Sequence, residues 1–166
     1  MRIPRRPRLP ADVRAGLRLA GGERVLAFGR LVHGGWVVAT DRALLVDGER
    51  LDWSSTSHAE WHDDSSVLTV GQMRTPGGAA PVRLLRLEEP GYLPETVRER
   101  VESSIVVSRH VPMRGRTGVR VVARRDASGG DLRWQVVVDA GLDPQDPEVA
   151  EFARAALEGL RRELGA

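Results

Sequence analysis

The chain has 166 residues, of which 41% are hydrophobic and 29% charged, so it is long enough to bury a full core and is not composed like a disordered segment. No apolar run approaches the ~20 residues of a membrane-spanning helix, and no cysteine is present for disulfides, thiolate zinc sites or thiol catalysis. All 25 basic residues are arginine, which excludes Schiff-base and Walker-type lysine chemistry.

The N-terminus is a basic arm. Residues 1–10 carry four arginines and three prolines but no acid, and a proline at every third position prevents a helix. We therefore predict a flexible arm that packs on nothing or lies across a sheet, or that uses Arg5 and Arg6 to contact acidic lipid or nucleic acid. Further arginines interrupt every candidate signal core, so a cytoplasmic location is expected.

Residues 11–166 are predicted to form a single domain, in which residues 91–166 complete a strand meander over residues 11–90. In the meander, short runs rich in Val, Leu and Trp alternate with Gly-Gly, Thr-Asp and Asp-Gly breaks, as in an antiparallel sheet. The pattern predicts a short helix at 10–20, then strands at 24–32, 36–40, 43–46, 51–62, 67–70 and 82–87.

The predicted strand over residues 51–62 has the most regular pattern. Its odd positions hold Trp53 and Trp61 among other apolar residues, while its even positions are polar. Because side chains alternate between the two faces of a strand, the tryptophans are expected in the core and the polar set in solvent. Residues 54–57 are expected to hold a bend or bulge.

The second half combines helices with more strands. Apolar residues at spacing four predict a helix over residues 93–103, and a β-branched run predicts that a strand follows it at residue 105. A clear hairpin is predicted at 119–125 and 132–139. Asp146 is a suitable cap for a last helix over 147–164. These elements predict an α+β fold of mostly antiparallel strands.

The opening of the meander, GERVLAFGRLVHGGWVVATDRALLV, resembles that of bacterial PH-like and GRAM-like domains. The resemblance rests on Gly22-Glu23, an apolar strand, a Gly-containing hairpin and the turn Thr40-Asp41-Arg42. It implies a curved sheet or barrel of about seven to nine strands with a C-terminal capping helix, a role that residues 147–164 suit. The chain departs from the family in two ways: Ala43 replaces a frequent arginine after the turn, and the helix predicted over residues 93–103 splits the strands, which PH-like folds do not require. The whole chain also looks like an actinobacterial protein, which implies no activity.

His58, Glu60 and His62 are the only cluster of metal-ligand residue types. Alternate strand positions point the same way, and His-x-His spacing occurs in zinc sites. At ~3.3 Å per residue the three side chains are spread along the strand and would need a bulge to converge. The alternative is the solvent face of an amphipathic strand, so no metal or other cofactor is predicted and these residues remain weak candidates.

Six arginines lie in residues 103–125, which contain no acid. A four-residue loop at 127–130 would pair Val119, Val121 and Ala123 with Val138, Val136 and Trp134, forming an apolar face. The other face would then carry the candidate binding residues Arg120, Arg124, Arg133 and Gln135. Arg124 and Arg133 would be directly opposed, which destabilises a sheet unless an anion lies nearby. Either an acid from a neighbouring element, such as the last helix, neutralises this face, or the face binds an anion.

The sequence contains no recognised catalytic template. There is no Gly-x-Ser-x-Gly elbow, phosphate-binding loop or dinucleotide-binding glycine pattern. We therefore favour a non-catalytic cytoplasmic binding or scaffold module of PH-like type that recognises a protein, a peptide or an anionic membrane surface. The alternatives are nucleic-acid binding through the basic arm and the arginine-rich hairpin, and a ligand-carrying or enzymatic domain with an unrecognised pocket.

Overall fold

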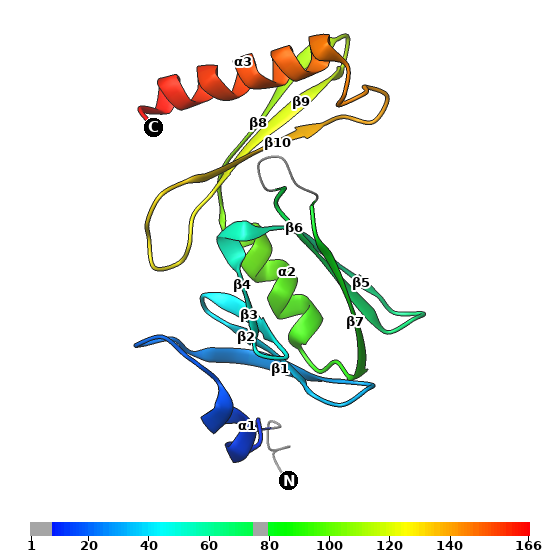
Figure 1. Cartoon of the computed structure of the whole chain (residues 1–166), viewed down its shortest axis with the longest axis vertical. Coiled ribbons are helices and arrows are strands. Elements are labelled where there is room, and N and C mark those ends of the chain that lie inside the picture. Colours follow the sequence, from blue (N-terminus) through cyan, green and yellow to red (C-terminus); the bar gives the residue numbers. More distant parts are fainter. Residues whose placement is uncertain (1–7, 75–79) are drawn as a thin grey trace, which may run out of the picture.

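The computed structural model describes residues 8–74 and 80–166. Within them, ten strands form two antiparallel sheets (Figure 1). The first sheet has seven strands in the order β4-β3-β2-β1-β7-β6-β5. Its strands are β1 (Val25–Leu31), β2 (Trp36–Thr40), β3 (Ala43–Val46), β4 (Glu49–Asp52), β5 (Thr56–His62), β6 (Val67–Gln72) and β7 (Val82–Glu89). Each strand therefore pairs with its neighbour in sequence, except where β1 meets β7.

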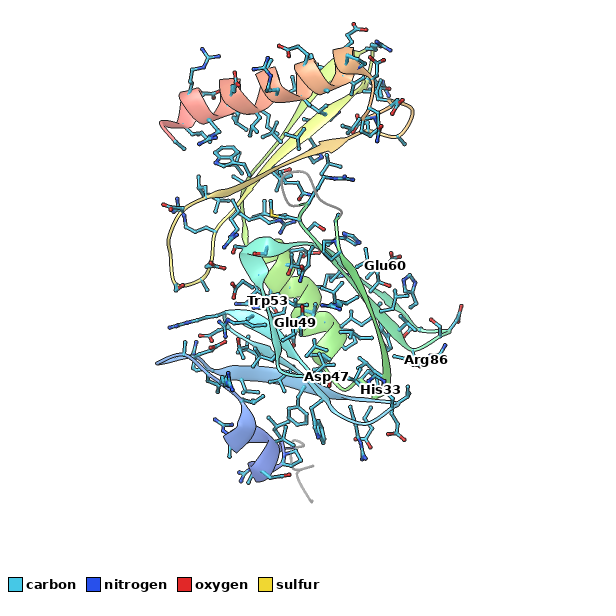
Figure 2. The ribbon with its side chains drawn as sticks, in the orientation of Figure 1. His33, Asp47, Glu49, Trp53, Glu60 and Arg86 are labelled. Carbon is cyan, nitrogen blue, oxygen red and sulfur yellow. The ribbon has the colours of Figure 1, made fainter. Side chains whose placement is uncertain are left out.

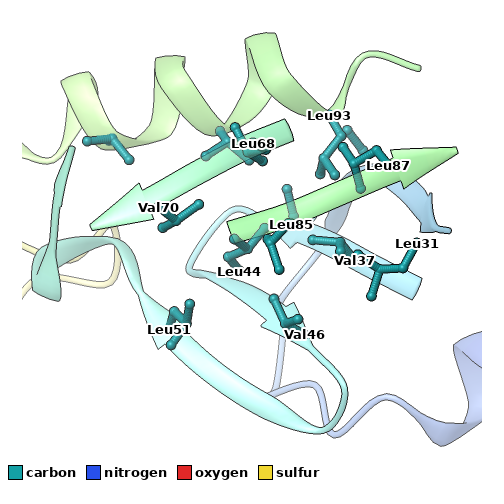
Figure 3. Packing of buried hydrophobic residues seen from close by; sticks show 14 of the residues in the cluster. Leu31, Val37, Leu44, Val46, Leu51, Leu68, Val70, Leu85, Leu87 and Leu93 are labelled. Atoms are coloured by element: carbon teal, nitrogen blue, oxygen red, sulfur yellow. The ribbon is translucent and has the colours of Figure 1, made fainter. Parts of the chain in front are cut away.

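Helix α2 (Leu93–Ser103) covers the seven-stranded sheet and completes its core (Figure 3). Leu93, Val97 and Val101 recur every four residues, so they lie on one face of the helix and are buried. They belong to a core cluster with apolar side chains from all seven strands of the sheet. The largest fully buried side chains among these are Leu31, Val37, Leu44, Leu68 and Val70. The interior of this sheet is thus filled by side chains.

The second sheet has three strands, in the order β10-β9-β8, and carries the C-terminal helix. Its elements are β8 (Ile105–Arg114), β9 (Thr117–Arg124), β10 (Arg133–Val138) and α3 (Pro147–Leu164). The side chain of Asp146 accepts a hydrogen bond from the Glu148 amide, as expected of a helix N-cap. In Figure 1, α3 lies across the end of this sheet farthest from the seven-stranded sheet. None of the helices in residues 8–74 and 80–166 combines the length and hydropathy needed to cross a bilayer.

The predicted α+β fold of mostly antiparallel strands and a C-terminal helix is confirmed. The number of strands exceeds seven to nine because the strand predicted over residues 51–62 is interrupted by a 3₁₀ turn, η1 (Trp53–Ser55). The turn forms because Trp53 is buried and its indole nitrogen donates to the Thr40 carbonyl at 3.0 Å. Helix α3 packs on the three-stranded sheet, and α2 is the helix that covers the seven-stranded sheet.

The N-terminal segment lies across the outer face of the seven-stranded sheet. Its short helix, α1 (Ala11–Gly16), falls inside the helix predicted at 10–20. Leu9 is buried against a second apolar cluster that contains Val38 and Leu45. Leu9, near the end of the predicted arm, is therefore packed against the sheet. Arg5 and Arg6 lie outside the described residues.

Candidate functional site

A groove of about 790 Å³ lies between the three-stranded sheet and the β5–β7 part of the seven-stranded sheet. Apolar side chains from three strands line it. Val82 of β7, Ile105 of β8 and Val137 of β10 are 53%, 38% and 43% exposed, respectively. Isolated exposed apolar residues are ordinary, but three that line one concavity indicate a binding surface.

The register of the β9–β10 hairpin decides which residues face the groove. Val119, Val121 and Ala123 pair with Val138, Val136 and Trp134, exactly the predicted register, and the opposed pair Arg124–Arg133 is present. Of the predicted binding residues, Arg120, Arg124 and Gln135 line the groove. Arg133 is exposed and is not among the residues that line it.

Arg124 is only 4% exposed, and it joins the two sheets. Its Nη1 donates to the Val101 carbonyl at 2.7 Å and to the Ser104 hydroxyl at 2.8 Å, while Nη2 donates to the Ser57 carbonyl at 2.7 Å. The first two acceptors lie at the C-terminal end of α2, where the helix dipole favours a cation.

No carboxylate among the described residues forms an ion pair with Arg124, and its Nε lacks a hydrogen-bond partner. Burial lowers the pKa of this guanidinium. Of the two opposed arginines, Arg124 therefore donates to neutral oxygen atoms, and the acid from a neighbouring element that was one of the two expectations is not its partner.

Acids of α3 do neutralise arginines, but on the opposite face of the three-stranded sheet. Glu163 pairs with Arg109, and Glu148 pairs with Arg114. On the groove face, Arg120 is exposed and makes one long hydrogen bond, from Nη1 to the Ser108 hydroxyl at 3.4 Å. The arginine-rich stretch is thus divided between a neutralised face and a groove face.

The charge of Arg120 acts on Asp139, and the carboxylate of Asp139 also accepts hydrogen bonds from other groups. His110 Nε2 lies 2.7 Å from Asp139 Oδ2, and the Gly118 amide donates to the same oxygen at 2.8 Å. Hydrogen bonding to His110, supported by the Gly118 amide and by the charge of Arg120, holds the pKa of Asp139 below its usual value.

The weak metal candidates point outward from β5. His58, Glu60 and His62 are exposed, and Figure 2 shows Glu60 on the side of the strand away from α2. Within residues 8–74 and 80–166, no three His, Asp or Glu side chains gather closely enough to hold a metal ion. His58 instead lies over Gly71, where an added Cβ would be 2.0 Å from its ring, and it lines the groove.

The residues that carry the PH-like resemblance form a structural network. The buried Glu23 carboxylate accepts hydrogen bonds from the Thr40 hydroxyl, the Ala20 amide and Arg50. The Thr40 hydroxyl oxygen also accepts from the backbone amide of Ala43, at 2.9 Å. Burial alone would raise the pKa of Glu23, but these hydrogen bonds outweigh it and the pKa is lowered. The motif therefore fastens the start of β1 to the β2–β3 turn.

No family model, curated protein or solved structure matches this chain. The candidate site therefore stands on geometry and charge. Its apolar residues were not recognised in the sequence because they lie on β7, β8 and β10, and single valines or isoleucines in strands carry no functional signal. The alternation of Arg120, Val122 and Arg124 was the signal that did identify one wall of the groove.

Replacing Arg124 with methionine should destabilise the protein by about 2 kcal/mol, because the acceptors at Val101, Ser104 and Ser57 lose their donor. Removal of a buried charge offsets part of this loss. Urea unfolding measures the difference. Arg133→Met, on the residue paired with Arg124, is the matched control and should stay within about 0.5 kcal/mol of the wild type. Equal stability of Arg124→Met and wild type would contradict this account.

Proposed function

We propose that the protein is a non-catalytic, cytoplasmic binding module of PH-like type that holds a polypeptide segment of a partner protein in the groove between its two sheets. The observation that carries the proposal is the groove itself, which is lined by exposed Val82, Ile105 and Val137. A partner segment would remove these side chains from water and so gain affinity.

The PH-like part of the proposal is supported by topology. Seven antiparallel strands are followed directly in the chain by α2, and this helix closes over their core. The resemblance of the opening residues implies a sheet with a C-terminal capping helix. The helix on the seven-stranded sheet is α2, and the predicted capping helix, residues 147–164, packs on the three-stranded sheet instead. The three-stranded sheet and α3 are then an addition to that unit, and the groove lies where the two parts meet.

The two alternative functions receive less support. Nucleic-acid binding would favour a continuous basic face, but Arg109 and Arg114 are paired with acids of α3 on the far side of the sheet. Ligand carriage would favour space inside the curved sheet, but the side chains of the main core fill that interior (Figure 3).

Selection of peptides from a random display library tests the proposal. Peptides enriched on the wild type should bind the double variant Ile105→Gln/Val137→Gln about tenfold more weakly, because two apolar contacts are lost. Fluorescence anisotropy gives the affinities. Leu164→Gln is the matched control, since Leu164 is 44% exposed at the end of α3, away from the groove. Failure to enrich any peptide, or unchanged binding to the double variant, would contradict the proposal.

A further inference from the structure

The groove is an acid-free surface. Its described lining includes the three arginines Arg74, Arg120 and Arg124 together with His58, but no aspartate or glutamate. The chain as a whole has 23 acidic residues against 25 basic ones, so an average surface of this protein carries both signs. The one-sided charge of the groove is therefore a local property.

Several arginines elsewhere in the protein are paired with carboxylates. Besides the two pairs with α3, Arg83 pairs with Glu49, Arg154 with Glu151, and Arg50 with Glu23. In the groove, the guanidinium of Arg124 is removed from water without such a partner. A buried cation that has only neutral hydrogen-bond acceptors keeps a positive electrostatic potential around it. An anion bound in the adjoining groove would offset this potential.

Arg120 supplies the donors that such an anion needs. A guanidinium carries five N–H groups, and this exposed side chain uses one of them, in a long hydrogen bond to Ser108. The carboxylate of Asp139 is held by His110 and by the Gly118 amide. Arg120 can therefore take a carboxylate in a two-point, charge-assisted pair.

We infer that the groove binds an acidic segment of a partner protein, in which Asp or Glu residues alternate with apolar residues. The carboxylates face Arg120, and the apolar side chains cover Val82, Ile105 and Val137. An extended peptide presents alternate side chains to opposite sides. One set would face Arg120 on β9, and the other set would face the apolar side chains of the other strands. The inference rests on the proposed function and adds the chemistry of the partner.

A peptide fits these observations better than a membrane or a nucleic acid. A bilayer surface is broad and cannot enter a concavity between two sheets, and a nucleic acid would place a phosphate at each step along the exposed Val82, Ile105 and Val137. Only a chain that mixes acidic and apolar side chains satisfies both kinds of lining residue.

The test compares two fluorescently labelled peptides of about eight residues. In the acidic peptide, Glu occupies every second position, with Leu or Ser between. The neutral peptide has Gln in place of every Glu. The acidic peptide should bind the wild type about tenfold more tightly by fluorescence anisotropy. Arg120→Gln should abolish most of this preference and Arg120→Lys should retain part of it. Arg116→Gln is the control, because Arg116 is exposed in the β8–β9 turn and outside the groove.

The outcomes separate this inference from the proposed function. Equal binding of the two peptides, or a preference that survives Arg120→Gln, overturns the inference. If the binding of neutral peptides from the display library still depends on Ile105 and Val137, the proposed function stands without the preference for acidic segments. Stronger, Arg120-dependent binding to phosphatidylserine-containing vesicles or to a single-stranded oligonucleotide than to the acidic peptide also overturns the inference.

Discussion

Gly118→Ala is expected to destabilise the protein by roughly 3 kcal/mol or more, a larger effect than most single substitutions cause. A Cβ at this position would lie 2.0 Å from the Val111 carbonyl oxygen and 2.7 Å from the Pro112 Cα. Both atoms belong to the backbone of β8, so no side-chain rotation relieves the overlap. The register of β8 and β9 also shifts between Pro112 and Arg114, which brings the two strands together at this point.

The consequence should extend to the hydrogen bonds around Gly118. Its amide donates to Asp139 Oδ2, and its carbonyl accepts from the Asp139 amide at 3.0 Å. Displacing β9 would weaken both and loosen β10. Urea unfolding measures the loss. Gly159→Ala in α3 has nothing within 4 Å of the new Cβ and should gain about 0.5–1 kcal/mol. An unchanged urea midpoint for Gly118→Ala would show that β8 can move aside.

Glu23→Gln should lower stability near pH 7 by about 2 kcal/mol. The carboxylate is fully buried and pairs with Arg50, whose side chain is 35% exposed. Breaking a fully buried pair costs about 3–5 kcal/mol, and solvent at Arg50 reduces that figure here. Glu88→Gln is the control, since this glutamate is 58% exposed and lies 3.8 Å from an exposed Arg30. It should change stability by less than about 0.5 kcal/mol.

The pH dependence of the Glu23→Gln effect follows from its lowered pKa. The folded pKa lies below the ordinary value of 4.5, so the stabilisation is fully present above that value and disappears as the pH falls through the folded pKa. The stability difference between wild type and Glu23→Gln should therefore be constant near neutrality and shrink in acid. Thermal unfolding across this range measures it. A difference that persists in strong acid would assign the effect to packing.

The parts of this fold that could be predicted are those that residues close together in the sequence determine. The β9–β10 register was predictable because a four-residue loop at residues 127–130 fixes which positions of the two strands are paired. Helix α3 was predictable from Asp146 and Pro147. A bend or bulge was predicted over residues 54–57, but the 3₁₀ turn at Trp53–Ser55 was not, because it involves a hydrogen bond from Trp53 to Thr40, thirteen positions earlier in the sequence.

The candidate site was predictable only in part. The face bearing Arg120, Arg124 and Gln135 followed from the hairpin, but the burial of Arg124 did not, because arginine is almost never fully buried without a partner. The opposite wall comes from β5, β6 and β7, whose approach to β9 depends on packing at a distance in sequence. His58, a weak metal candidate in the sequence, lies over Gly71 and lines the groove.

The join between β1 and β7 bears on the order in which the chain folds. In the described residues the strand pairing between the β1–β4 meander and the β5–β7 meander consists of Arg30–Glu89 and Leu31–Leu87, whereas all other strand pairings link sequence neighbours. Pairings between neighbours close short loops and form early, while the β1–β7 join must close a long one. The two meanders should therefore assemble independently. Docking of α2, with Arg124 at its C-terminal end, would then complete folding and create the groove in the same late step.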